Sequence, residues 1–272
     1  MRSRHWLVRA GTAAALLFLY VPIGVVVLYA FNRSRTQSWP PDLFTAHWFV
    51  EAWRDPEVRH ALLNSVLAGL GATSVALVLG SLAAFALHRF RFFGREAVSL
   101  FLVLPIALPG IVTAIALASA IDVVRRSGLI DYSIWTIVVG HATFCVVVVY
   151  NNVIARLRRT PASLVEASMD LGADGWQTFR YVTLPNISTA LLAGGLLAFG
   201  LSFDEIVVTN FTAGSVLTLP IWIFNHLRLP RDRPVVNVVA MAVILLSLLP
   251  VYLAQRLAGR EAGLGHLGGG RG

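Results

Sequence analysis

Residues Leu62–Leu87 read LLNSVLAGLGATSVALVLGSLAAFAL, a run without a single charged side chain. The hydrocarbon core of a bilayer is about 30 Å thick, and a helix needs about 20 predominantly apolar residues to cross it. The run is too long for a strand and lacks the polar face that a surface helix of a soluble protein shows. It therefore predicts a transmembrane helix.

Composition places the whole chain in the same class. Of its 272 residues, 57% are hydrophobic and 13% are charged, whereas soluble domains carry about 25% charged residues. The mean hydropathy is +0.72. These values exclude an intrinsically disordered chain, which needs low hydrophobicity and a high density of charge. They indicate a multi-pass membrane protein.

Five further apolar runs are long enough to cross a bilayer, so we predict an all-α membrane protein with six transmembrane helices. The first run is longer than the apolar core of a signal peptide, which spans roughly 7–15 residues, and we expect it to be retained. The transmembrane domain then covers residues 11–257, between a cytoplasmic N-terminus (1–10) and a flexible cytoplasmic tail (258–272). The five runs are Gly11–Phe31, Ala97–Ile121, Ile134–Ala155, Ser188–Phe211 and Val235–Leu257.

Arginine placement predicts the orientation of these helices. The chain contains no lysine, so arginine supplies all 22 of its basic residues. Thirteen of them fall on the side that holds both termini and the loops 88–96 and 156–187, and nine fall on the other side. Short loops rich in arginine stay in the cytoplasm, which places both termini inside. The net charge of +8 is explained by this topology, and we expect no nucleic-acid partner.

The missing residue types exclude several functions. A P-loop needs a lysine to bind the nucleotide phosphates, and this chain has none. Any energy from nucleotide hydrolysis must therefore come from a partner protein. Schiff-base chemistry is excluded for the same reason. Cys145 is the only cysteine, which rules out an internal disulfide and a cysteine zinc cluster. No two histidines have metal-ligand spacing on one helix, and no nucleophile motif occurs. We therefore expect no catalytic activity, no metal and no cofactor in this chain.

The loop between the fourth and fifth runs predicts two short helices. Thr160 can cap the first with Pro161 at its first position, and Gly172 can end it in a left-handed conformation. Asp174 and Gln177 have the spacing of a capping box for the second. Pro185 would then separate the second helix from the fifth transmembrane helix.

Two interpretations of this loop remain open from local chemistry. Glu166 and Asp170 lie four residues apart on one helix face, while Ala167, Ser168 and Gly172 are small enough for a partner backbone to approach. Such a surface could enter a groove of another protein. The same residues would also suit a solvated connector.

A motif separates these interpretations. The loop fits the pattern E-A-A-x3-G-x9-I-x-L-P, with identical residues at five positions and Ser168 and Val182 as small changes at two others. This pattern is typical of permease subunits of binding-protein-dependent ABC importers, which the chain resembles from about residue 64 to residue 249. The identical residues are Glu166, Ala167, Gly172, Leu184 and Pro185.

The resemblance implies a mechanism and a set of partners. The first short helix, which includes Asp170, would be a coupling helix that docks into a cleft on a separate ABC ATPase. Two copies of that ATPase would bind ATP and magnesium, and a second permease subunit would complete the pathway. An extracytoplasmic solute-binding protein would deliver the solute to the bacterial inner membrane.

The resemblance is closest to the second permease of spermidine/putrescine importers. It rests on several short stretches that related permeases for opines, iron and other solutes partly share. Family members of this type often carry an acid where this chain has Gly110, which removes one expected carboxylate. The stretches are Asn64–Ser65, Leu104–Pro105, Gly140–Phe144, Leu197–Glu205 and Thr218–Pro220.

Asp204 and Glu205 are the candidate residues of the solute pathway. An ionised acid within a membrane usually faces a cavity or a partner. On the fifth helix Asp204 shares a stripe with Leu197, Leu201 and Val208, so we expect Asp204 rather than Glu205 to face the path. Carboxylates there would compensate a polyamine for lost hydration, and Phe203 could add a cation–π contact. The alternative is an ion pair between Asp204 and an arginine of the partner permease.

Three other features receive simpler interpretations. We expect His141 to be a hydrogen-bonded packing residue rather than a proton relay, and Cys145 a small core residue. Asp122 is either a helix cap or a partner of Arg125. Pro105, Pro109 and Gly110 predict a kink in the third helix.

Rival classes lack their sequence signatures. A secondary transporter driven by an ion gradient would show paired discontinuous helices in two repeated halves. An intramembrane enzyme would need several polar groups at matched depth.

Overall fold

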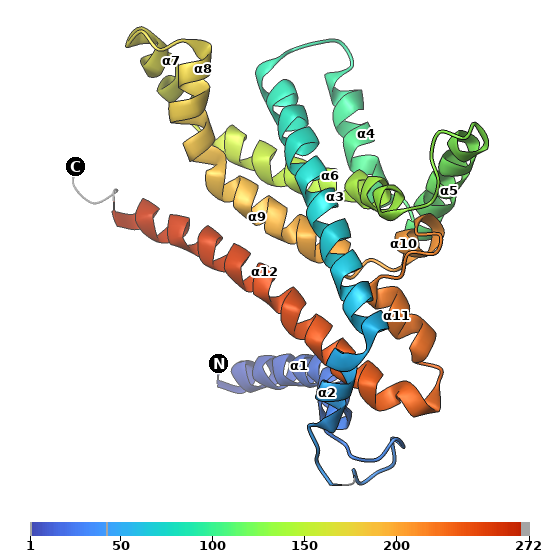
Figure 1. Ribbon diagram of the computed structural model, residues 1–272. Coiled ribbons are helices and arrows are strands. Elements are labelled where there is room, and N and C mark those ends of the chain that lie inside the picture. The colour runs from blue at the N-terminus through green and yellow to red at the C-terminus, as the bar shows by residue number, and fades with distance from the viewer. Residues whose placement is uncertain (1, 42, 268–272) are drawn as a thin grey trace. The chain divides into compact units, whose positions relative to one another are not determined.

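The computed structural model describes residues 2–41 and 43–267 (Figure 1). Within these residues the regular secondary structure is helical, apart from an isolated antiparallel bridge between Asn32 and Phe44. The chain forms two compact units. Unit 1 combines Met1–Ala61 with Leu219–Leu246, and unit 2 combines Leu62–Thr218 with Ser247–Gly272.

The expected transmembrane helices are present, with one of them bent. Five helices are long and apolar enough to cross a membrane, and a sixth candidate is a bent pair. This confirms the all-α class and the six spans if the pair counts as one. The five are α1 (Arg2–Ala30), α3 (Pro56–Arg89), α6 (Ile134–Arg159), the run of α8, η1 and α9 (Gly175–Phe203), and α12 (Arg233–Leu267); the pair is α4 (Arg95–Ala107) with α5 (Gly110–Arg126).

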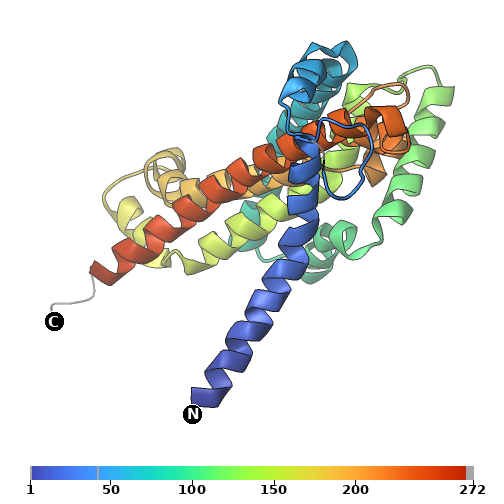
Figure 2. The same cartoon turned by 90° about the horizontal axis from the view of Figure 1, so that it is seen from below.

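The predicted kink in the third span is a complete break. The axes of α4 and α5 meet at 105° (Figures 1 and 2). Leu108 is extended, with ψ of 145°, and Pro109 stands at the N-cap of α5. A residue before proline is driven out of the helical region, and proline has no N–H to continue the hydrogen-bond ladder. The kink predicted from Pro105, Pro109 and Gly110 is therefore confirmed, and it divides the run Ala97–Ile121 between two helices.

The fifth span also ends earlier than predicted. Helix α9 (Leu184–Phe203) stops at Phe203, and Asp204 is its C-cap. A separate short helix, α10 (Val207–Thr212), follows and packs against α5 and α6. The continuous helix expected over Ser188–Phe211 is replaced by two helices with a break between them.

The chain ends are more helical than the sequence suggested. Helix α1 begins at Arg2, inside the segment predicted as an N-terminal tail. Helix α12 continues to Leu267, so the predicted tail 258–272 is helical up to that residue, and the remainder lies outside the described residues. Alanine, leucine, arginine and glutamate favour helix and outweigh the glycines in this stretch.

Unit 1 includes three short elements. They are α2 (His47–Arg54), α11 (Leu219–His226) and the turn η2 (Pro230–Asp232). The indole Nε1 of Trp48 donates to the Asn32 carbonyl at 2.8 Å, and the side chain is buried. Trp48 is therefore a core residue of this unit.

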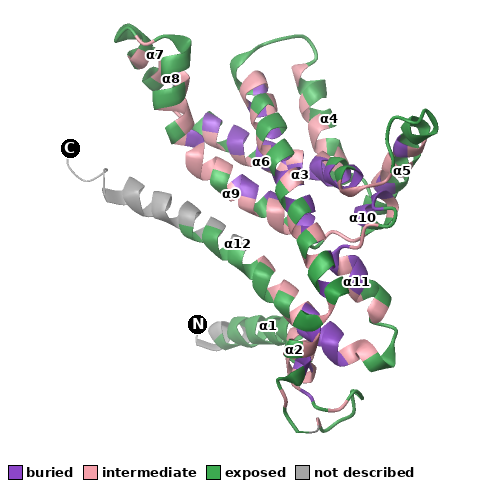
Figure 3. Cartoon of the chain, in the orientation of Figure 1, coloured by how far each residue is buried: buried purple, intermediate pink, exposed green. Residues whose placement is uncertain are grey.

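Helix α6 forms the centre of unit 2. Figure 3 shows its buried residues on several faces, whereas the described side chains of α1 are mostly exposed. Close approach to α6 depends on small residues, as is common between membrane helices. A Cβ on Gly80 of α3 would lie 2.8 Å from the Val146 carbonyl oxygen, and one on Gly194 of α9 would lie 3.3 Å from the Val149 Cα.

We expect Gly80→Ala to destabilise the protein by about 1–3 kcal/mol, since a rigid backbone carbonyl cannot yield to the added methyl group. Gly200→Ala in α9 is the matched control, because a Cβ there meets nothing within 4 Å. Thermal unfolding of the purified full chain in detergent measures both. Equal midpoints for the two variants would contradict the tight α3–α6 contact.

Candidate functional site

The loop that carries the motif forms a short helix with a fixed end. Helix α7 covers Ala162–Asp170, and Gly172 follows with φ of +89°. The Gly172 N–H donates to the Met169 carbonyl at 2.9 Å, and the Ala173 N–H donates to the Ser168 carbonyl at 3.0 Å. These two bonds define a Schellman motif, which satisfies the last carbonyls of a helix. The predicted left-handed Gly172 is confirmed.

The start of α7 differs from the prediction. Pro161, rather than Thr160, occupies the N-cap, and it caps without a side-chain hydrogen bond. The Thr160 hydroxyl instead donates back to the Arg156 carbonyl at 3.2 Å, at the end of α6. The hydroxyl is therefore directed back toward the end of α6.

The second short helix starts as predicted. Helix α8 covers Gly175–Thr178. The Gln177 N–H donates to Asp174 Oδ1 at 2.8 Å, and the Asp174 N–H donates to Gln177 Oε1 at 2.9 Å. This reciprocal pair is the expected capping box.

Pro185 does not separate α8 from the fifth span. A π-helical stretch, η1 (Phe179–Thr183), joins α8 to α9, and Pro185 lies in the first turn of α9. The Leu184 N–H donates to the Phe179 carbonyl, five residues back. A wider turn accommodates a proline ring that would clash with the carbonyl four residues earlier in a regular α-helix. The helix therefore continues through the end of the motif.

The α7–α8 segment (residues 162–178) presents acids and apolar side chains together. Glu166, Ala167 and Asp170 are exposed, and so is Gly172. Leu171 is 89% exposed and Trp176 69% exposed. Apolar side chains this exposed beside acids are typical of a surface that another protein covers.

Ser168 has a different position from its neighbours. Its hydroxyl donates to the Val165 carbonyl at 2.8 Å and lies 3.0 Å from the hydroxyl of buried Thr178. Where the motif has alanine, this chain therefore uses serine to tie α7 to α8. Of the remaining motif residues, Leu184 is half-buried and Pro185 is exposed.

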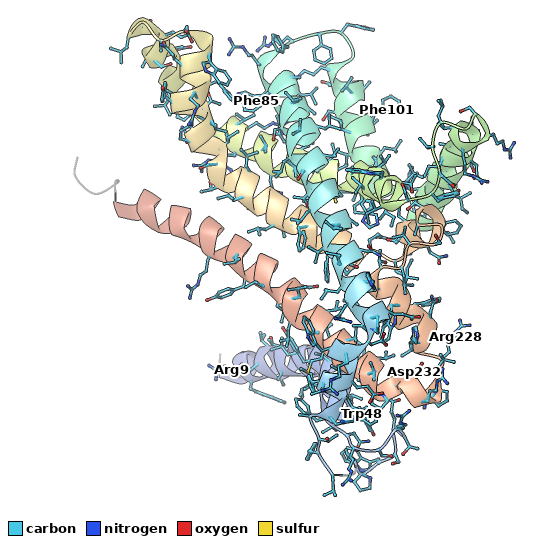
Figure 4. All side chains as sticks on the ribbon, viewed as in Figure 1. Arg9, Trp48, Phe85, Phe101, Arg228 and Asp232 are labelled. Carbon is cyan, nitrogen blue, oxygen red and sulfur yellow. The ribbon has the colours of Figure 1, made fainter. Side chains whose placement is uncertain are left out.

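A cavity of 330 Å³ connects this segment with the end of α3. Glu166 and Thr178 line it from the α7–α8 segment, and Phe85 and His88 line it from α3. The rings of Phe85 and Phe179 lie 5.6 Å apart, edge to face (Phe85 is labelled in Figure 4). Helix α3 therefore contacts η1 directly through this ring pair.

The second predicted site surrounds the break between α9 and α10. His141 is 1% exposed, and its Nδ1 lies 2.7 Å from Ser202 Oγ. Its Nε2 lies 2.8 Å from Thr209 Oγ1, which itself donates to the Glu205 carbonyl at 2.6 Å. Since the threonine proton is used, His141 must donate from Nε2 and accept at Nδ1 from Ser202. The predicted packing role of His141 is confirmed.

The two acids at the break have different roles. Glu205 Oε1 accepts from the Val208 N–H at 3.0 Å and so caps the first turn of α10. Asp204 is exposed, and among the described residues it forms no ion pair. The helical stripe that we used to orient Asp204 does not exist, because Val208 belongs to another helix. The exposure of Asp204 nevertheless keeps it available to a solute or a partner.

Phe203 is 2% exposed and lies beside Phe199 with ring centroids 5.8 Å apart. Its ring face is not accessible in this conformation. Gly110 begins α5 and is exposed, and a Cβ there would meet nothing within 4 Å. The absence of an acid at this position is therefore not imposed by packing.

Other predictions concern individual residues. Cys145 is buried and its Sγ donates to the Ala198 carbonyl at 3.4 Å. Asp122 pairs with Arg125 at 3.2 Å and accepts from the Tyr132 hydroxyl at 3.1 Å. Burial, followed by that hydrogen bond to Asp122, raises the pKa of Tyr132. The described residues contain no group of three or more acids, histidines or cysteines that could hold a metal ion.

Sequence reasoning missed the partners of His141. Ser202 and Thr209 lie 61 and 68 residues away from it in sequence. The only available signal was that all three are polar residues within apolar runs, and such residues usually pair.

The fold and these sites define an integral membrane component of a transport system. Residues 76–262 match the family model described as "Binding-protein-dependent transport system inner membrane component", and the chain belongs to this family. The chain is 34% identical over 255 residues to the spermidine/putrescine transport system permease protein PotC of Haemophilus influenzae, covering 93% of this chain and 96% of the relative. It is 33% identical over 252 residues to the putrescine transport system permease protein PotI of Escherichia coli, covering 88% and 87%.

Solved structures share the fold at lower identity. One is a bacterial alginate ABC transporter in complex with an alginate pentasaccharide-bound periplasmic protein. The TM-score is 0.70 at 17% identity, with 95% of this chain and 96% of the other covered. At this identity the likeness establishes the fold alone.

We expect His141→Leu to destabilise the protein by about 1–3 kcal/mol, since the buried Ser202 hydroxyl would lose its acceptor, while the Thr209 hydroxyl would keep its bond to the Glu205 carbonyl. His88→Leu, at an exposed position at the end of α3, is the control. Thermal unfolding of both full-length variants in detergent gives the comparison. An unchanged midpoint for His141→Leu would show that the network does not stabilise the break.

Proposed function

We propose that this chain is a permease subunit of an ATP-driven importer of polyamines. The observation that carries the proposal is the α7–α8 segment, whose Schellman end and capping box present exposed acids and apolar side chains on a fixed scaffold. The identity of about one third to spermidine/putrescine permeases over most of the chain supports the solute.

The α7–α8 segment would act as the coupling element. Glu166, Ala167 and Asp170 would enter a cleft on an ABC ATPase that binds ATP and magnesium. Two ATPase copies would move two such segments together as they close, one on this chain and one on a second permease. The fixed junction between α7 and α8 would make the transmission of this movement effective, because a frayed helix would deform instead of passing the movement on. The permease itself carries out no chemistry.

The topology follows from the same assignment. The α7–α8 segment must face the cytoplasm, where ATP is available. An even number of spans then places both termini inside, in agreement with the distribution of arginine. On the opposite side of the bacterial inner membrane, a solute-binding protein would deliver the solute.

Asp204 is the residue that we assign to the solute path. A polyamine is a flexible polycation, and it loses hydration when it enters a membrane protein. An exposed carboxylate at a break between helices can replace part of that hydration without a fixed cation of its own. Glu205 supports this arrangement by capping α10. Phe203 would contribute only if the break rearranges during transport.

A different small solute, such as an opine, is the alternative within the same class. The permease fold alone does not select the solute, since an alginate transporter shares it at 17% identity. The choice rests on the relatives and on Asp204.

The coupling role predicts that Glu166→Gln and Gly172→Ala lower transport while membrane insertion stays intact. Alanine at a φ of +89° costs about 1–2 kcal/mol and distorts the end of α7. Asp131→Asn, which removes an exposed acid from the loop before α6, is the matched control. ATP-dependent uptake and co-purification of the ATPase are measured for each variant. Normal uptake by both coupling variants would refute the assignment.

The solute role predicts that Asp204→Asn lowers uptake of radiolabelled putrescine or spermidine by about tenfold, the equivalent of about 1.4 kcal/mol. Uptake is measured in proteoliposomes that hold the complete assembly and internal ATP. Glu205→Gln should transport better than Asp204→Asn, because a glutamine oxygen can still accept from the Val208 N–H. The opposite order would assign the path to Glu205.

If the binding protein stimulates ATPase activity but no polyamine is taken up, the assignment as an importer subunit stands and polyamine is excluded as the solute.

A further inference from the structure

The turn between α3 and α4 has an unusual surface. Its sequence Arg89–Arg95 reads RFRFFGR, and all three phenylalanines are exposed. Phe90 is 59% exposed and Phe93 fully exposed. Aromatic rings that alternate with arginines are typical of segments lying at a membrane interface, where the rings enter the boundary of the acyl chains and the guanidinium groups meet phosphates.

A cavity of 580 Å³ lies beside this turn. Arg91 reaches it from the turn, Arg95 from the first residue of α4, and Arg158 from the end of α6. The single acid in its lining is Glu96. The excess of positive charge favours an anion.

Part of this cavity is held in place by hydrogen bonds. Arg95 Nε donates to the Leu87 carbonyl at 2.8 Å, which fixes the guanidinium against the end of α3. The Tyr150 hydroxyl lies 3.1 Å from Ser99 Oγ, and Tyr150 is 3% exposed. Both hydroxyls line the cavity. The site therefore has buried, oriented polar groups in addition to flexible surface charge.

The start of α4 adds to the positive potential. Gly94 is the N-cap, and no side chain caps the helix. The first N–H groups of a helix carry partial positive charge and suit an anion when no side chain occupies them. Arg91 and Arg158 are exposed, and within the described part of the chain neither forms an ion pair. Their guanidinium groups are available to a ligand.

We propose that this cavity binds the phosphate of an anionic membrane phospholipid. Phosphate is the shared chemistry of a lipid headgroup and a free phosphate ion, and the surroundings favour the lipid. Helix α4 continues from the cavity with exposed apolar side chains, including Leu100 and Phe101, each 69% exposed (Phe101 is labelled in Figure 4). Acyl chains could lie along this surface while the headgroup stays in the cavity. Basic pockets between helix ends on the cytoplasmic side are suited to such headgroups.

The site is independent of the transported solute. It attracts an anion, whereas the proposed path attracts a polycation. If polyamine uptake is not observed, the lipid site is not refuted. If lipid binding is not observed, the polyamine proposal is not refuted.

The test is native mass spectrometry of the delipidated full-length chain with added phosphatidylglycerol. We expect the double variant R91Q/R158Q to bind this lipid about tenfold or more weakly, since the charge-assisted hydrogen bonds from two guanidinium groups to the phosphate would be lost. R126Q, at the exposed end of α5, is the matched control and should bind like the wild type. Phosphatidylcholine, which has no net charge, should bind more weakly than phosphatidylglycerol.

Two further measurements separate the alternatives. F93S should weaken phosphatidylglycerol binding without lowering the thermal midpoint, because Phe93 is fully exposed. If millimolar inorganic phosphate displaces the lipid and F93S has no effect, the site binds a free anion and the lipid assignment is wrong. If R91Q/R158Q retains the lipid but no longer co-purifies with the ATPase, the turn is a protein contact and the proposal is overturned. Equal lipid binding by the double variant and the wild type, at equal thermal stability, also refutes it.

Discussion

The constraint that governs this structure is that backbone N–H and C=O groups within a bilayer must be hydrogen-bonded inside the protein. Long helices meet it automatically, and most of the apolar sequence is helical. The two places where helix stops within apolar sequence are therefore the places that need special arrangements. At Leu108 and Pro109, the proline has no N–H group, so one fewer backbone donor needs a hydrogen-bond partner. At Asp204–Ile206 the freed groups are served by side chains, since Thr209 bonds the Glu205 carbonyl and Glu205 caps the Val208 N–H.

The second break depends on a histidine from another helix. His141 connects Ser202, before the break, with Thr209, after it. A neutral imidazole has one donor and one acceptor, and both are used here. The network holds α9 and α10 in one arrangement and leaves the neighbouring Asp204 carboxylate exposed. A carboxylate can therefore remain exposed in a region where an unsupported backbone would be costly.

The α7–α8 segment does not have to satisfy its backbone groups inside a bilayer. It lies outside the apolar spans, so water could satisfy its backbone, yet the junction between α7 and α8 is closed by a Schellman motif and a capping box. The continuous helix from Gly175 to Phe203 then links it directly to the break at Asp204. Pro185 would interrupt that link in an ideal α-helix, and the π-helical stretch before it restores the connection. A displacement of the α7–α8 segment would therefore be transmitted along one helix to the break at Asp204.

The sequence alone determined the class of protein, the number of spans and the junction between α7 and α8. These features depend on residues close together in the chain: apolar length, the φ of Gly172, and the reach from Asp174 to Gln177. The sequence predicted a kink near Pro109 and Gly110 in the third span. It did not reveal the break in the fifth span, because the apolar residues on both sides of Asp204 and Glu205 form one run. It predicted a cap at Thr160 that α6 uses instead, and a separation at Pro185 that a π-helix removes. The pairing of His141 with residues more than 60 positions away, and the exposure of Asp204 beside a buried Phe203, were decided by tertiary packing. Such contacts depend on which helices become neighbours, and no local pattern encodes that choice.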